Sequence, residues 1–205
     1  MENKYKEISP SRSEIISKHL GEFIYNKNII EFGASSGSTL YDLKYKYNCE
    51  VSAYDVLPVN LSFCESNFFD LDFDDLDSIR NSIDNCDLVL FLDVLEHIKS
   101  PKDVLESILR INDKVKVFMI SPNFSSIRML LSWLSGFVPD HSSGFFDKTH
   151  LKWLSPKWLK INLSDAEYES EIFYVFSDVF FFRIIQKFYP SRLCSQFGAV
   201  IKVKK

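Results

Sequence analysis

The residues of this sequence that are best suited to chemistry come directly after its apolar runs. Gly33 and Gly37 are the one close pair among only six glycines in 205 residues, and they follow the apolar segment 28–32. Glycines let a ligand approach the backbone closely, and the N-terminus of a following helix offers free N–H groups. The pair therefore predicts a ligand-binding turn between a strand and a helix.

Carboxylates accompany the next two apolar runs. Asp55 ends the segment 50–55, and Asp70 lies within the segment 66–73. The first carboxylate can accept hydrogen bonds from both hydroxyls of a ribose, and the second can accept one from an adenine amine. Together with the glycine turn, these acids indicate a ligand with a nucleoside part.

A third polar group follows the most apolar run, 87–93. If a helix begins near Asp93, then Asp93, Glu96 and His97 stand at i, i+3 and i+4 and share one face of that helix. Imidazole titrates near neutral pH, so His97 and the later His150 suit general base catalysis.

Five apolar segments must position these groups, and they alternate with helical patterns; the segments are 28–32, 50–55, 66–73, 87–93 and 114–121. Such alternation predicts a parallel, doubly wound α/β sheet. Ligands of such sheets lie beyond the carboxyl ends of the strands, where all the residues named above should gather.

Helix starts and ends are marked by capping residues. Ser11 and Glu14 have the spacing of a capping box before a first helix that Gly21 closes. Ser100 and Ser155 each precede a proline, which predicts two later helices with serine caps. A further helix is expected over 126–134, and two strand-like runs, 171–176 and 199–204, end the chain.

Composition excludes several classes of protein. Hydrophobic residues make up 46% of the chain and charged residues 25%, which suits one packed globular domain. A net charge of -4 disfavours a nucleic-acid partner. No apolar run reaches the ~20 residues of a membrane span and the N-terminus lacks a signal peptide's apolar core, so we expect a cytoplasmic protein without stable membrane insertion. The four cysteines show no CxxC spacing, which indicates free thiols.

Four segments in order resemble motifs of the class I S-adenosylmethionine-dependent methyltransferases. They are IIEFGASSGS, AYDVLP, CDLVLFLDVLEHIKSPKDVLESILRIN, which resembles the subgroup with a Leu-Glu-His signature, and FMISPN. Further on, GFFDKTHLKWLSPKWL is similar to a segment of methyltransferases from bacterial surface-polysaccharide gene clusters. The resemblance covers roughly residues 25–203.

The resemblance implies a Rossmann-like, mostly parallel, seven-stranded sheet with a reversed last strand and helices on both faces. It implies a single domain over 1–205, with an N-terminal helical extension at 1–24 and an acceptor-side insertion at 123–165. The cofactor would be S-adenosylmethionine, held by Glu31, Gly33, Ala34, Ser35, Gly37, Asp55, Val56, Asp70, Leu71 and Asp93. Ser35 departs from the family's glycine motif, and a serine suits that turn if its φ is negative.

The activity that the resemblance implies is O-methylation of a small molecule such as a sugar or an activated sugar derivative, by a monomer or a homodimer. His97 and His150 would be the catalytic bases. Some methyltransferases with an acid-x-x-Glu-His pattern hold a divalent metal with a later histidine, here His150 or His141, but the base is the interpretation we favour. The alternative is a non-catalytic binding or scaffold subunit.

Overall fold

The structure is a computed structural model that describes residues 11–72, 74–136, 147–163, 167–176 and 186–204. His141 lies outside these residues. The helices are α1 (Arg12–Leu20), α2 (Ser38–Tyr47), α3 (Arg80–Asp84), α4 (Pro101–Ile111), α5 (Ile127–Leu134), α6 (Pro156–Asn162) and α8 (Pro190–Leu193). The strands are β1 (Asn28–Phe32), β2 (Glu50–Asp55), β3 (Glu65–Phe68), β4 (Leu88–Leu92), β5 (Lys116–Pro122), β6 (Tyr168–Val175) and β7 (Gln196–Val203). Short 3₁₀ turns cover Gly21–Ile24, Leu76–Ile79 and Leu95–His97.

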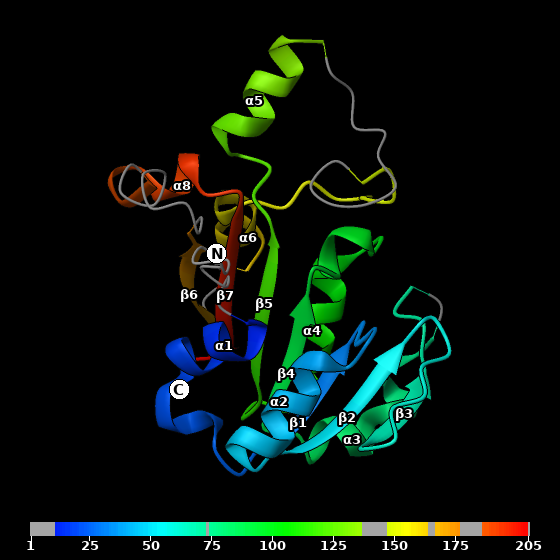
Figure 1. Cartoon of the computed structure of the whole chain (residues 1–205). Helices are drawn as coiled ribbons and strands as arrows, with labels where there is room; N and C mark the ends of the chain where they lie inside the picture. The colour runs from blue at the N-terminus through cyan, green and yellow to red at the C-terminus, as the bar shows by residue number, and fades with distance from the viewer. Residues whose placement is uncertain (1–10, 73, 137–146, 164–166, 177–185, 205) are drawn as a thin grey trace, which may run out of the picture.

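The strands form one seven-stranded sheet in the order β3-β2-β1-β4-β5-β7-β6 (Figure 1). Strands β1 to β5 pair in parallel, whereas β7 runs antiparallel between β5 and β6. This arrangement confirms the predicted doubly wound sheet with a reversed last strand. Because the parallel strands are in register, their carboxyl ends meet at one edge, and the reversed strand begins at that same edge.

Side chains of the strands alternate between two cores, one on each face of the sheet. In β4, Val89 and Phe91 belong to the core that α4 and α6 cover, while Leu88 and Leu90 belong to the core that α1 and α2 cover. Strand β4 lies at the centre of the parallel part of the sheet, so both of its faces are buried and its sequence is apolar throughout.

Most capping predictions are confirmed. Ser11 and Glu14 form the capping box of α1, and the Ser155 side chain accepts the N–H of Trp158 at the start of α6. Pro101 begins α4 and Ser100 occupies its N-cap position as predicted, but the Ser100 side chain makes no capping hydrogen bond. The third strand is also shorter than expected and ends at Phe68, where the chain turns into a run of aspartates that bond to each other's backbone.

Among the helices that the structure describes, none is both long enough and apolar enough to span a bilayer.

Candidate active site

The glycine turn joins β1 to α2 at the carboxyl edge of the sheet. Gly33 has φ +73° and Gly37 has φ +69°, a left-handed conformation that glycine adopts without strain. A Cβ on Gly33 would overlap the side chain of Val94, so this position also requires the absence of a side chain. Ser35 has φ +46°, so the negative φ under which a serine would suit this turn is not observed.

Asp55 at the end of β2 holds this turn in place. One of its carboxylate oxygens accepts the N–H of Ser35 at 2.8 Å, and the other accepts the N–H of Leu57 at 2.9 Å. The hydrogen bond to the backbone of Ser35 helps to stabilise its left-handed conformation. Each oxygen keeps a further lone pair, so the nearly buried carboxylate can still accept hydrogen bonds from a diol.

Glu31 lies under the turn and is only 4% exposed. Burial, followed by the charge of Asp55, raises the pKa of Glu31 to about 8, so its carboxyl group is mostly protonated at neutral pH. Its Oε2 has no hydrogen-bond partner among the residues that the structure describes. A buried polar atom without a partner beside a glycine turn fits a polar ligand at this place.

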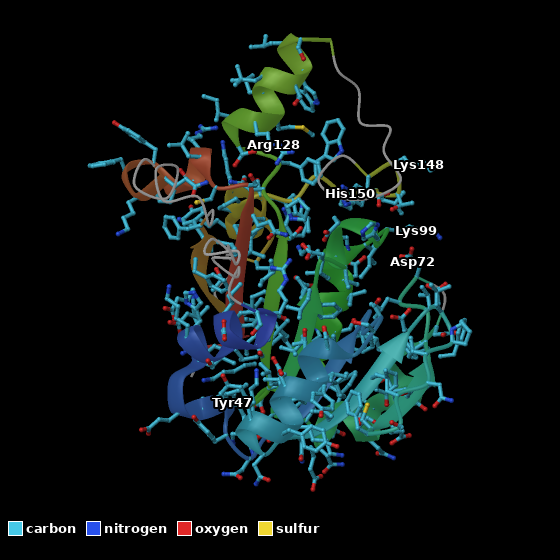
Figure 2. All side chains as sticks on the ribbon, viewed as in Figure 1. Tyr47, Asp72, Lys99, Arg128, Lys148 and His150 are labelled. Atoms are coloured by element: carbon cyan, nitrogen blue, oxygen red, sulfur yellow. The ribbon has the colours of Figure 1, made fainter. Side chains whose placement is uncertain are left out.

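The remaining predicted nucleoside contacts lie beyond β2 and β3. Val56 is half exposed, and Leu71 packs against the core. Asp70 accepts the N–H of Asp72, and Asp72 in turn accepts the N–H of Lys99 at 2.8 Å, which ties this loop to the start of α4 (Figure 2). The groups that the sequence predicted for a nucleoside therefore do share one edge, and they fit S-adenosylmethionine in the chemistry of their donors and acceptors.

Asp93 lies at the end of β4, but the predicted shared face with Glu96 and His97 is wrong. Its φ is +58°, so the chain turns there and only a short 3₁₀ turn follows. The Asp93 carboxylate instead forms an ion pair with Arg12 of α1 and accepts a hydrogen bond from the amide of Gln196 at 2.8 Å. Burial raises the pKa of Asp93, and the guanidinium of Arg12 partly offsets this.

His97 is oriented by the segment that follows α5. Its Nδ1 lies 3.2 Å from the backbone oxygen of Thr149 and 2.9 Å from the Thr149 hydroxyl. A carbonyl oxygen can only accept, so Nδ1 carries the proton and Nε2 carries the lone pair. The Thr149 hydroxyl donates to Asp147 at 2.6 Å. Hydrogen bonds from the hydroxyl and the N–H of Thr149 lower the pKa of the Asp147 carboxyl group, which keeps it ionised.

The backbone of Glu96 positions His150 next to His97. Its backbone oxygen accepts the N–H groups of Leu151 and Lys152 at 2.8 and 2.9 Å, which fixes the following segment against the Leu95–His97 turn. The rings of His97 and His150 then lie 4.8 Å apart. Both histidines line a cavity of about 410 Å³ that also touches Asp93 and Arg128, and Figure 2 shows His150 below Arg128.

Glu96, His97 and His150 each offer a ligand atom for a cation, and these atoms lie within 4.8 Å of one another. The Glu96 side chain is fully buried, and its Oε2 accepts a hydrogen bond from Ser121. Burial and the charge of Asp93 raise the pKa of Glu96 to about 8, so in this structure the group is mostly protonated at neutral pH. Asp93 does not belong to this cluster.

Arg12 and Gln196 contribute to the site, and the sequence analysis did not identify either of them. For Gln196 a signal was available, because a reversed last strand must begin where the parallel strands end. For Arg12 there was none, since only the packing of α1 against the sheet brings it to Asp93.

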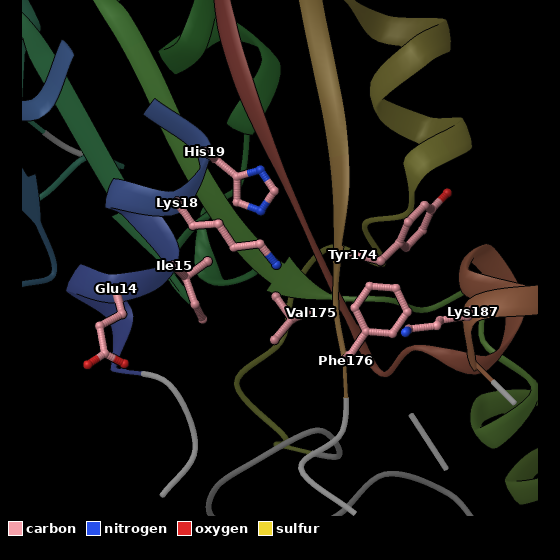
Figure 3. A pocket seen from close by; sticks show the side chains of 8 residues that line it. All are labelled: Glu14, Ile15, Lys18, His19, Tyr174, Val175, Phe176 and Lys187. Carbon is pink, nitrogen blue, oxygen red and sulfur yellow. The ribbon is translucent and has the colours of Figure 1, made fainter. Parts of the chain in front are cut away.

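A second cavity, of about 470 Å³, lies between α1 and β6 (Figure 3). Its walls include Lys18, His19 and Tyr174 but none of the residues that the sequence predicted for a site. We therefore place the candidate active site in the cavity of His97 and His150 together with the glycine turn.

Comparison with known proteins identifies the family and agrees with the fold. Residues 6–157 match the family model described as a methyltransferase domain. No curated protein matches the chain. Similar solved structures include a SAM-dependent methyltransferase from Archaeoglobus fulgidus, which is 17% identical over 96% of each chain with a TM-score of 0.60.

Two further solved structures share the fold. The N-terminal domain of EvdMO1, solved in the presence of SAH and D-fucose, is 14% identical with a TM-score of 0.62, covering 100% of this chain and 90% of that one. The CurJ carbon methyltransferase is 13% identical with a TM-score of 0.60, covering 94% of this chain and 53% of that one. The chain shares its fold with S-adenosylmethionine-dependent methyltransferases, and it belongs to the methyltransferase domain family.

Proposed function

We propose that the chain is an O-methyltransferase that acts on a hydroxyl group of a small molecule, such as a sugar or an activated sugar derivative. The observation that carries the proposal is the hydrogen-bonded series Asp147, Thr149 and His97 at the cavity. A hydroxyl is a weak nucleophile until its proton is removed, and this series presents a histidine nitrogen that can accept the proton.

S-adenosylmethionine supplies a methyl carbon that is activated by a positively charged sulfur. The chain's own task is to bind the cofactor, to orient the acceptor and to remove a proton. We assign Asp55 to the ribose hydroxyls, and the backbone of the glycine turn with Glu31 to the polar groups next to it. The assigned contacts are Glu31, Gly33, Ala34, Ser35, Gly37, Asp55, Val56, Asp70, Leu71 and Asp93.

On the acceptor side, Nε2 of His97 takes the hydroxyl proton. The positive charge that then forms on the imidazole is stabilised through Thr149 by the ionised Asp147. His150 is the second candidate base, because its ring lies beside that of His97. Both groups act where the reacting oxygen would lie, so they affect turnover more than cofactor affinity.

Two observations favour a carbohydrate acceptor. Trp153 is 57% exposed, and its ring stacks near Phe124, which in turn contacts His150; an exposed aromatic face suits the apolar side of a sugar. The similar EvdMO1 domain was solved with D-fucose. The fold alone does not decide the acceptor, because CurJ, which shares it, is a carbon methyltransferase. The resemblance of 144–159 to enzymes of surface-polysaccharide gene clusters supports the sugar.

A divalent cation bound by Glu96, His97 and His150 is the competing way to activate the hydroxyl. The clustering of the three ligand atoms favours it, whereas the hydrogen-bonded series Asp147, Thr149 and His97 favours the base. A scaffold subunit without activity is the third interpretation, and the oriented histidine argues against it.

The test combines binding and turnover. Calorimetry with S-adenosylmethionine, SAH and NAD should show binding of the first two only. Release of SAH is then followed with sugars, nucleotide-activated sugars, small amines and catechols as acceptors, and the product is identified by mass. Methylation of a sugar hydroxyl supports the proposal. Transfer to nitrogen or carbon contradicts it, and binding without transfer to any acceptor supports the scaffold.

A further inference from the structure

Helix α5 projects beyond the carboxyl edge of the sheet, at the top of Figure 1, and its apolar side is exposed. Ile127, Leu130, Leu131 and Leu134 follow the spacing i, i+3, i+4 and i+7, so they form one stripe along the helix. All four are exposed, up to 75% for Leu134, while Met129 on another side of the helix is buried. The helix is thus amphipathic with its apolar stripe turned outward, the reverse of a helix that covers a core.

Further exposed aromatic residues adjoin α5. Trp133 lies with its ring 5.1 Å from that of Trp153, and both are about half exposed. Phe188 and Tyr189, which precede α8, are also exposed, and α8 packs next to α5. Phe124, Met129, Leu130 and Trp133 line an apolar hollow of about 470 Å³, with Arg192 among its walls. We call this surface, formed by 124–134, 151–153 and 188–192, the α5 face.

The charge of the chain is divided unevenly, and the α5 face lies on its positive part. Residues 114–205 carry 13 lysines and arginines but only 7 acids, whereas residues 1–113 carry 11 and 21. No acid occurs between Asp113 and Asp140, a stretch that contains all of α5. Arg128, Lys152 and Arg192 belong to the α5 face. Lys148, labelled with Arg128 in Figure 2, lies on the adjoining segment.

We propose that the α5 face binds the surface of an anionic phospholipid bilayer. Leucines on an outward stripe can enter the acyl boundary, Trp133 suits the headgroup level, and the arginines and lysines suit lipid phosphates. A second copy of the chain fits less well, because a twofold interface would place this positive face against itself. The helix lies on the membrane in this arrangement and does not cross it.

The arrangement bears on how an acceptor reaches the site. Arg128 belongs to α5 and also lines the cavity of His97 and His150. One wall of the cavity is therefore formed by the helix that carries the outward stripe, and an acceptor carried on a lipid would be presented beside that wall. Bilayer binding itself does not depend on methyl transfer.

The test is cosedimentation of the full chain with vesicles of phosphatidylcholine alone or mixed with phosphatidylglycerol. We expect binding to the mixed vesicles, weaker binding at high salt, and a blue shift of tryptophan emission on binding. The double variant L130D/L134D should bind at least about tenfold more weakly, because two buried leucines are lost from the interface. The matched control is Tyr45→Asp, an exposed aromatic position on α2, which should bind as the parent does.

Thermal unfolding and calorimetry with S-adenosylmethionine check that the variants are folded, and they keep this test separate from that of the proposed function. Absence of binding to anionic vesicles overturns the proposal, as does equal binding by L130D/L134D. A homodimer that L130D/L134D dissociates, in a protein that does not sediment with vesicles, would assign the α5 face to a second copy instead.

Discussion

The cofactor side and the acceptor side of the site are built in different ways. On the cofactor side, Asp55 bonds to the turn twenty residues before it, and both segments follow neighbouring strands. On the acceptor side, His97 is oriented by Thr149, fifty-two residues away, and the connection runs through the backbone oxygen of Glu96. The order of the strands alone positions the cofactor-side residues. The acceptor-side histidines depend instead on how the segment after β5 packs back against the Leu95–His97 turn.

This comparison predicts that the two sides separate in kinetics, and the largest effect should come from the proposed base. His97→Ala should lower kcat by about 10²–10⁴-fold, the usual contribution of a general base, with the affinity for S-adenosylmethionine within a few-fold. His150→Ala is measured beside it. Steady-state assays of SAH release and calorimetry provide the two numbers. His19→Ala, a histidine outside the cavity, is the control. Full turnover in both site variants would mean that neither histidine is catalytic.

Asp55→Ala should have the opposite effect, because it should lower cofactor affinity more than turnover. It removes the acceptor for the ribose hydroxyls and the bonds that hold Ser35 and Leu57. We expect cofactor affinity to fall about 10- to 100-fold, since a hydrogen bond to a charged group contributes roughly 1.5–3 kcal/mol. Turnover at saturating cofactor should change much less. Asp103→Ala, an exposed carboxylate on α4, serves as control in calorimetry, and unchanged affinity in Asp55→Ala would place the cofactor elsewhere.

Thr149 tests whether the long connection matters for chemistry. Thr149→Val should lower kcat about five- to tenfold, because it removes a hydrogen bond of roughly 1 kcal/mol net that orients His97, while the KM for the cofactor stays the same. Thr149→Ser keeps the hydroxyl and should restore the rate. If the Thr149→Val and Thr149→Ser variants have the same kcat, the hydroxyl of Thr149 does not contribute to the chemistry.

The buried carboxyl group of Glu31 should make the free energy of unfolding depend on pH. Its pKa in the folded protein is about 8, above the 4.5 of an unfolded chain. Its contribution to the free energy of unfolding is therefore fully present below about pH 4.5 and is lost as the pH rises through about 8. Relative to Glu31→Gln, the parent protein without cofactor should lose stability over this range. Urea unfolding at several pH values measures the difference, and parallel curves would contradict a buried neutral Glu31.

Chelation is expected to have the smallest effect. With His97 as base, EDTA should leave turnover unchanged. If EDTA abolishes turnover and magnesium or manganese restores it, Glu96, His97 and His150 hold a cation, and the assignment of the base is wrong.

Local patterns were sufficient for much of the fold. The central strands, the capping box at Ser11 and the proline starts of α4 and α6 follow from residue types and spacing, since each depends on neighbours in the chain. The reversed last strand was expected from the family resemblance alone. The conformations of Ser35 and Asp93 could not be predicted from local patterns. Both have positive φ, which a side chain adopts only when contacts from elsewhere, here Asp55 for Ser35 and Arg12 with Gln196 for Asp93, hold the backbone there.

By itself the sequence determined the glycine turn, the acids at the strand ends and the edge where they meet, because hydrophobic periodicity dictates where each strand stops. Only the tertiary structure decided that Asp93 turns toward Arg12 and not toward His97, that Thr149 sets the tautomer of His97, and that α5 faces outward. These features depend on hydrogen bonds and packing between distant segments, and residue type and spacing along the chain carry no information about which distant partner a side chain will meet.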